Sequence, residues 1–290
     1  MSSRTPSKRV PAPLYALGAI ASVQLGATVA RHLFDVLGAT GTVFLRVGFG
    51  ACILLAIARP RWPRFESRQW RAIVLFGLVI AGMNLCFYQA IARIPLGIAV
   101  TIEFLGPLGV AIAGSRKAVD FVWAIMAAGG VAMLSIGGGH VTRLGALLAL
   151  GAAAGWAAYI VLSQRVGRLV PGPDGLALAL GVAAVALLPF GIAAGGRRLL
   201  DLRNLGVGLV VAVLSSAIPF SLEFAALRRL SSQVFGILMS LEPAMGAAAG
   251  YLFLGQRLSF RDLIAIALVM VASAGATRTA AGTPAATDVP

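Results

Sequence analysis

The sequence predicts an all-α membrane protein with ten transmembrane helices, arranged as two inverted five-helix repeats. Hydrophobic residues make up 59% of the 290 positions, charged residues only 12%, and the mean hydropathy is +0.92. This composition suits lipid rather than water. Ten apolar stretches follow one another along the chain, and the fourth resembles the ninth. These observations together predict the fold class.

Each apolar stretch is long enough to cross about 30 Å of hydrocarbon as a helix. The connections between them are short, and the longest loop, residues 58–71, leaves no room for a soluble domain. The expected spans are 12–30, 39–58, 72–92, 96–115, 120–138, 144–164, 175–195, 205–227, 232–253 and 262–277.

The first span follows basic residues and ends near "ATVA", a pattern shared with cleavable signal peptides. Nine further spans favour an uncleaved first helix. Cys52 and Cys86 both fall inside apolar spans, where a free thiol behaves as a small hydrophobe. We therefore expect no disulfide framework, no metal site and no cofactor.

We interpret the net charge of +14 as a signal that orients the chain in the membrane. Lysine and arginine occupy short caps between apolar spans rather than one continuous polar face, so nucleic acid is not an expected partner. With the N-terminus in the cytoplasm, the inner segments carry more basic residues than the outer ones. We expect both termini to be cytoplasmic.

The two halves of the chain are similar. Residues 92–109 align with 228–246 when Pro107 is placed on Pro243. Five spans is an odd number, so the second copy would enter the membrane from the opposite side, as in many secondary transporters. The expected parts are a cytoplasmic tail, two five-helix repeats and a disordered tail, at 1–11, 12–138, 144–277 and 278–290.

Away from the ends of the predicted spans, the charged residues are Arg46, Glu103, Glu223 and Glu242. A charge at the bilayer centre costs about 2.5 to 3.5 kcal/mol on insertion scales, so such residues generally face a bundle interior and mark a pathway or proton site. Two alternatives remain open: Glu223 could reach the inner interface near basic residues, and Arg46 could form a structural ion pair.

Two of the glutamates adjoin helix breakers, in "EFLGP" (103–107) and "LEP" (241–243). Proline lacks an N–H, so Pro107 and Pro243 each leave the carbonyl four residues earlier without its helical donor. Free backbone acceptors at membrane depth are tolerated where they line protein or a wet cavity. We expect a binding site near both breaks. Pro189 and Pro219 could equally do no more than bend their helices.

Buried charges of both signs fit a zwitterion, whose carboxylate would meet Arg46 or a helix end and whose ammonium would meet a glutamate. A small amino acid qualifies. The proton is the natural coupling ion, because an apolar pocket favours the neutral form of a carboxyl group. The chain has no GxxxxGK[ST] loop, which disfavours direct use of ATP.

Three blocks, residues 93–124, 151–167 and 214–259, resemble the drug/metabolite transporter superfamily, and within it the EamA group. The resemblance extends over about 12–277. It implies a multi-pass carrier of the bacterial inner membrane that exports small amino acids, of the threonine and homoserine kind, or related metabolites by proton antiport. Arg46, Glu103, Pro107, Glu223, Glu242 and Pro243 match the family pattern.

Two alternative functions are retained. An exporter of cationic or lipophilic compounds would use the carboxylates alone, with Arg46 as a structural counter-ion. A membrane-embedded lipid enzyme would need a histidine, a metal cluster or an activated nucleophile beside its acids, and neither His32 nor His140 lies near a membrane-depth carboxylate in sequence. The sequence makes no prediction of the oligomeric state.

Overall fold

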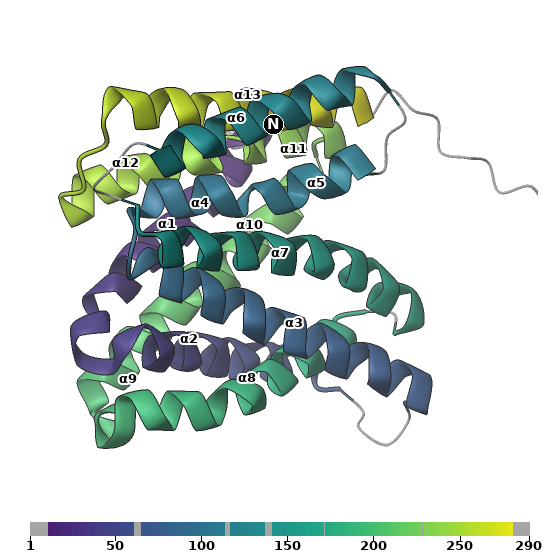
Figure 1. Cartoon of the computed structure of the whole chain (residues 1–290). Coiled ribbons are helices and arrows are strands. Elements are labelled where there is room, and N and C mark those ends of the chain that lie inside the picture. The colour runs from purple at the N-terminus through teal and green to yellow at the C-terminus, as the bar shows by residue number, and fades with distance from the viewer. Residues whose placement is uncertain are drawn as a thin grey trace, which may run out of the picture.

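The structure, a computed structural model, describes residues 11–60, 65–113, 117–136, 141–170, 172–227 and 229–280. This part of the chain is helical throughout, with no strand (Figure 1). The predicted tails fall mostly outside the described residues. The helices are α1 (Ala12–His32), α2 (Phe34–Ala58), α3 (Ser67–Ile91), α4 (Leu96–Glu103), α5 (Leu105–Ala113), α6 (Val119–Ile136), α7 (Arg143–Leu169), α8 (Asp174–Gly195), α9 (Leu202–Ala212), α10 (Ile218–Leu227), α11 (Ser232–Met239), α12 (Glu242–Leu254) and α13 (Phe260–Ala280), with short helices η2 (Gly196–Leu200) and η3 (Val213–Ala217).

The all-helical prediction is confirmed for the described residues, and every predicted span corresponds to between one and three of these helices. Nine helical segments of this part are long and apolar enough to cross a membrane. The fifth predicted span, 120–138, corresponds to α6, whose apolar stretch Val119–Leu134 is shorter. At the C-terminal end, α13 continues to Ala280, past the predicted boundary at 277.

Several of the helical segments are interrupted. Gly38 has φ of +67°, a conformation open to glycine, and it breaks α2 after one turn. The fourth predicted span is divided at Phe104 into α4 and α5, and the ninth is divided between α11 and α12. The eighth passes from α9 through a π-helical turn, η3, into α10. A proline follows each of the last three interruptions. Proline has no backbone N–H, so it cannot donate a hydrogen bond to the preceding turn, and the helix is weakened there.

Contacts between the two halves follow a symmetric pattern. The second, fourth and fifth helical segments of each half pack against their own counterparts, as α2 on α8, α4 on α12, and α6 on α13. The first and third segments exchange partners, since α3 packs on α7 while α1 packs on α10. Figure 1 shows α6 and α13 along one edge of the bundle and α8 along the opposite edge. Each half therefore completes the packing of the other.

Glycines bring helices of the two halves into close contact. A Cβ placed on Gly97 of α4 would lie 2.5 Å from the Cα atom of Ala247 in α12. A Cβ on Gly77 of α3 would lie 2.5 Å from the carbonyl oxygen of Ala179 in α8. Small residues allow backbones to approach in this way in membrane bundles, where van der Waals packing drives association.

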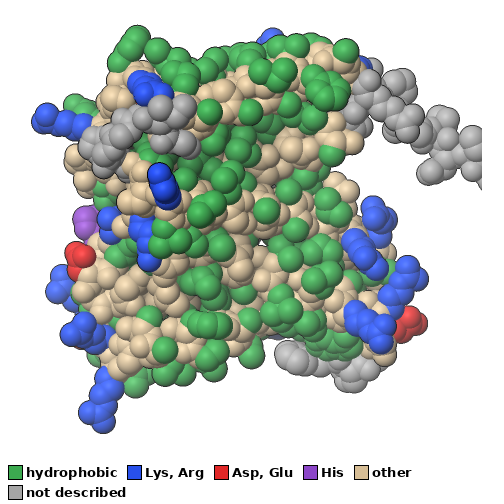
Figure 2. Space-filling view, in the orientation of Figure 1, with side chains coloured by type: hydrophobic (Ala, Val, Ile, Leu, Met, Phe, Trp, Pro, Cys, Tyr) green, Lys and Arg blue, Asp and Glu red, His purple; other side chains and the backbone are tan. Residues whose placement is uncertain are grey.

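The outer surface has the distribution expected for a protein in lipid. Figure 2 shows lysine and arginine gathered at the two ends of the bundle, with hydrophobic side chains over the band between them. Large apolar side chains such as Phe121, Ile125 and Val185 are more than two thirds exposed, at 74%, 71% and 70%. In water such a surface would be costly, whereas acyl chains solvate it.

The close contact of α4 with α12 predicts that Gly97→Ala is destabilising. The added methyl group would collide with backbone atoms that cannot move independently, and we expect a loss of about 1 to 3 kcal/mol in the free energy of unfolding. Gly82→Ala is the matched control, because a Cβ there meets nothing within 4 Å. Thermal unfolding in detergent should show a lower midpoint for Gly97→Ala only. Equal midpoints would contradict the described packing.

Candidate functional site

A central cavity of about 440 Å³ lies between the two halves of the chain. This volume falls within the range of roughly 300 to 1,000 Å³ that is usual for small-molecule sites. Its lining comes from α1, α2, α3, α4, α5, α7, α8, η3, α10, α11, α12 and α13. The lining includes all four charged residues singled out in the sequence, and one of the two prolines: Arg46, Glu103, Glu223, Glu242 and Pro107. Pro243 is buried in the first turn of α12.

Two buried oxygen atoms at this cavity have no hydrogen-bond donor. Glu242, the first residue of α12, is 7% exposed, and Gln24 in the middle of α1 is 3% exposed. Neither Glu242 Oε2 nor Gln24 Oε1 has a partner among the described residues. Gln24 Oε1 faces the next turn of α12, since it would lie 3.2 Å from a Cβ on Gly246. An unpaired buried acceptor is costly, so the pair favours a ligand that brings donors.

Arg46, on α2, is held by neutral groups. Its guanidinium donates a hydrogen bond to Asn84 Oδ1 of α3 and lies 5.4 Å from the centre of the Tyr88 ring. Asn84 Nδ2 in turn donates to the carbonyl oxygen of Ile80, at 2.9 Å, which fixes the amide. The described residues include no ion pair between Arg46 and a cavity glutamate, so the structural ion pair considered above is absent from this part of the chain. Its positive charge remains available to a ligand.

Glu103 and Glu223 complete the charged lining. Glu103, the last residue of α4, is near enough to Glu242 and Arg46 for their charges to interact. Glu223, on α10, is similarly placed with respect to Glu242. Repulsion between nearby carboxylates favours placing a proton or a bound cation among them.

The helix interruptions lie at the same cavity. The hydroxyl of Ser240, between α11 and α12, donates to the carbonyl oxygen of Gly236 at 3.1 Å and can accept from the Ser273 hydroxyl of α13, with the two Oγ atoms 3.0 Å apart. In η3, the carbonyl oxygen of Leu214 accepts a hydrogen bond from Ser22 Oγ, at 2.7 Å. The Ser22 hydroxyl thus satisfies a carbonyl group in the π-helical turn, whereas the Gly236 carbonyl also accepts from the backbone N–H of Ser240, at 3.2 Å. Ser215 and Ser216 of the π turn line the cavity, as is common for such turns at functional sites.

Several cavity residues have no counterpart among the sequence predictions. Gln24, Asn84 and Ser216 are uncharged, and single polar residues of this kind are frequent in membrane helices. Their convergence depends on helix rotation, which the sequence does not specify. Gln24 is the one amide side chain in the stretch "ASVQLGATVA", and this was the signal that the sequence offered. The aromatic side chains Trp156 and Phe104, whose rings meet edge to face with centroids 5.5 Å apart, were equally unforeseen.

A helical bundle with an apolar outer surface and an internal cavity that contains charged side chains is the architecture expected of a membrane carrier, and comparison with known proteins agrees. The EamA-like transporter family matches the chain twice, at residues 10–136 and 143–278. The chain belongs to this family and is a multi-pass membrane protein.

Curated relatives cover most of the chain. The threonine/homoserine exporter RhtA of Salmonella typhimurium is 44% identical over 269 residues, which is 92% of this chain and 91% of the relative. RhtA of Escherichia coli K12 is 43% identical over 266 residues, covering 91% and 90%. A solved crystal structure, 20% identical, has a TM-score of 0.59 and covers 94% of this chain and 99% of its own. At that identity, the likeness concerns the fold alone.

The unpaired carboxylate of Glu242 predicts that its removal stabilises the protein. We expect Glu242→Ala to raise the free energy of unfolding by about 1 kcal/mol, because the substitution deletes a buried acceptor without a donor. Asp262→Ala is the matched control. Asp262 is 6% exposed, but its carboxylate accepts from Ser259 N and Ser259 Oγ, both at 2.8 Å, so its loss should be destabilising. Chemical unfolding in detergent would test this contrast, and equal destabilisation by both would contradict it.

Proposed function

We propose that this chain is a secondary active transporter that exports small amino acids, of the threonine and homoserine class, across the bacterial inner membrane in exchange for protons. One observation carries the proposal: a single cavity joins an arginine without a carboxylate partner to buried acceptors without donors. Relatives named as threonine/homoserine exporters, 43–44% identical over almost the whole chain, support the substrate class.

The proposed pose uses both ends of a zwitterion. The ligand carboxylate would accept hydrogen bonds from the Arg46 guanidinium, whose remaining donors suit a planar anion. The ammonium would donate to Glu242 Oε2 and Gln24 Oε1, and so supply the donors that these atoms lack. A short hydroxylated side chain would then meet the serines of η3. A ligand of this kind would compensate the charge of Arg46 and supply hydrogen-bond donors to Glu242 Oε2 and Gln24 Oε1, which lack them in the empty site.

Proton exchange follows from competition at the carboxylates. In the inward-facing form, a binding ammonium would favour ionised Glu242, and the displaced proton would leave to the cytoplasm. In the outward-facing form, the amino acid would depart and a proton from outside would replace it. We assign Glu103 to the same proton and ammonium site, because its charge acts on Glu242, and Glu223 to a relay or gate on the inner side.

Alternating access would rest on ten transmembrane helices in two inverted repeats, bounded at about 12–138 and 144–277. The double family match and the exchange pattern of helix contacts support two equivalent halves. In this arrangement α6 is the fifth span, and it packs against its counterpart α13, the tenth. An odd number of spans in each half inverts the second with respect to the first, and both termini would lie in the cytoplasm.

Export of cationic or lipophilic compounds is the second candidate. The cavity is lined by three carboxylates and by aromatic side chains including Phe87, Trp156 and Tyr159, which suit an organic cation. The two functions differ at Arg46, which a zwitterion needs and a cation would avoid. A lipid enzyme is less well supported, because the family consists of transporters.

In liposomes, counterflow with the twenty amino acids and homoserine should select small hydroxylated amino acids.

Glu103→Gln and Glu242→Gln should each abolish uptake driven by a pH gradient, since an amide cannot exchange a proton. Asp35→Asn, at an exposed carboxylate in the first turn of α2, is the control and should transport normally. Normal pH-driven flux in both glutamine variants would refute their roles. Preferential movement of a lipophilic dye would favour the second candidate.

Asn84→Asp should weaken the binding of amino acids. The new carboxylate would lie against the Arg46 guanidinium, form an ion pair and compensate the charge that the ligand needs. We expect KM to rise roughly tenfold or more, as for the loss of a charge-assisted contact. Asn84→Ser, which adds no charge, should have a smaller effect. An unchanged KM in Asn84→Asp would show that Arg46 does not bind the ligand carboxylate.

A further inference from the structure

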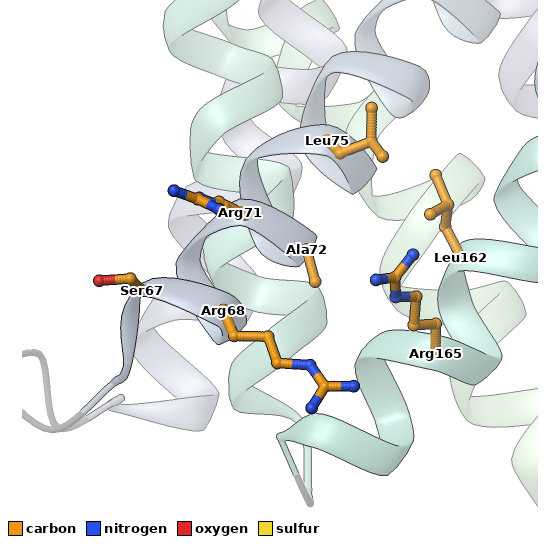
Figure 3. A pocket seen from close by; sticks show the side chains of 7 residues that line it. All are labelled: Ser67, Arg68, Arg71, Ala72, Leu75, Leu162 and Arg165. Carbon is orange, nitrogen blue, oxygen red and sulfur yellow. The ribbon is translucent and has the colours of Figure 1, made fainter.

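A second cavity, of about 390 Å³, lies between α3 and α7 and shares no lining residue with the central cavity (Figure 3). It is formed by the first turns of α3 and the last turns of α7. The family match does not assign it a role. Its lining residues are Ser67, Arg68, Arg71, Ala72, Leu75, Leu162 and Arg165.

Hydrogen bonds fix the shape of this cleft. Gln69 Nε2, in the first turn of α3, donates to the carbonyl oxygen of Leu169 at the end of α7, at 2.8 Å. The oxygen of the same amide accepts from the backbone N–H of Glu66, also at 2.8 Å, and thereby caps α3. The small side chain of Ala72 leaves room between the helices (Figure 3). The cleft is therefore built by the fold rather than by chance contact of flexible side chains.

The charge in the cleft is of one sign. In Figure 3, the guanidinium groups of Arg68 and Arg165 extend toward the space between α3 and α7 from its two sides, while Arg71 points away in this view. All three arginines are exposed. The nearest acidic residue in sequence, Glu66, forms a capping box with Gln69 at the start of α3. Two like charges facing one space favour an anion between them.

Beside the arginines, the cleft has an apolar part formed by Ala72, Leu75 and Leu162. Leu75, one turn further along α3, is 48% exposed, and Leu162 of α7 forms the other wall. Figure 2 shows basic side chains clustered at one end of the bundle, directly beside the hydrophobic surface. Arginine forks match phosphate oxygens, whereas leucine walls match an acyl chain.

We propose that this cleft binds an anionic phospholipid, with the phosphate between Arg68 and Arg165 and the first part of an acyl chain along Leu75 and Leu162. Basic clefts between helices at a membrane interface are suited to such headgroups. The lipid would bridge α3 to α7, which belong to different halves of the chain. This inference does not depend on the identity of the transported substrate.

Native mass spectrometry of the full chain in a neutral detergent can test the proposal by titration with phosphatidylglycerol, phosphatidylcholine or inorganic phosphate. We expect phosphatidylglycerol to be retained and phosphatidylcholine to be lost. In the double variant R68Q/R165Q, the apparent Kd for phosphatidylglycerol should rise about tenfold or more. The control R59Q/R278Q removes two exposed arginines elsewhere and the same charge, and it should bind as the parent chain does.

Three results would overturn the proposal. Equal weakening in the two double variants would indicate attraction by net charge alone. Equal retention of phosphatidylcholine would show that the headgroup charge is not recognised. Inorganic phosphate that displaces phosphatidylglycerol at equal concentration would assign the cleft to a free anion. The circular dichroism spectrum and thermal midpoint of R68Q/R165Q should match those of R59Q/R278Q, so a folding defect would be recognised separately.

Discussion

The cost of burying charge without a partner is the constraint on which this protein depends. A chain that spans lipid can hold Arg46 and Glu242 at depth only if the fold encloses them, and here segments from both halves surround one cavity. Their own neighbours do not neutralise them: Arg46 is held by an amide and a phenol ring, and one oxygen of Glu242 has no donor. A ligand with charges that match Arg46 and Glu242 would therefore gain binding free energy, because it supplies the partners that the protein does not.

The same constraint accounts for the irregular helices. A proline after each of three interruptions removes a backbone donor, and at the π-helical turn the Ser22 hydroxyl supplies a donor to the carbonyl oxygen of Leu214. These breaks lie where the cavity is, rather than at lipid-facing positions, because only protein or water can satisfy exposed backbone groups. Close glycine contacts, such as Gly97 against Ala247, then hold the halves together around a site that must remain polar.

Much of this arrangement follows from the sequence, for a physical reason. Charges within apolar spans are rare enough that Arg46, Glu103, Glu223 and Glu242 could be singled out, and all four line the central cavity. The breaks near Pro107 and Pro243 were also predicted. The roles of Gln24 and Asn84 could not be, since an isolated amide is tolerated in many membrane helices and its partners depend on how the helices rotate. Whether Pro219 does more than bend its helix was left open. The π turn before it was not predicted, because its register depends on packing against α1.

The central claim is that one cavity recognises both charged groups of an amino acid. Its most direct test is the affinity of the purified protein for three ligands of similar size: L-threonine, L-threonine amide, which lacks the carboxylate, and 2,3-dihydroxybutyrate, which replaces the ammonium by a hydroxyl group. The account predicts measurable binding of threonine and loss of binding for both analogues in isothermal titration calorimetry. Threonine amide that binds as tightly as threonine would contradict the role of Arg46, and equal binding of 2,3-dihydroxybutyrate would contradict that of Gln24 and Glu242.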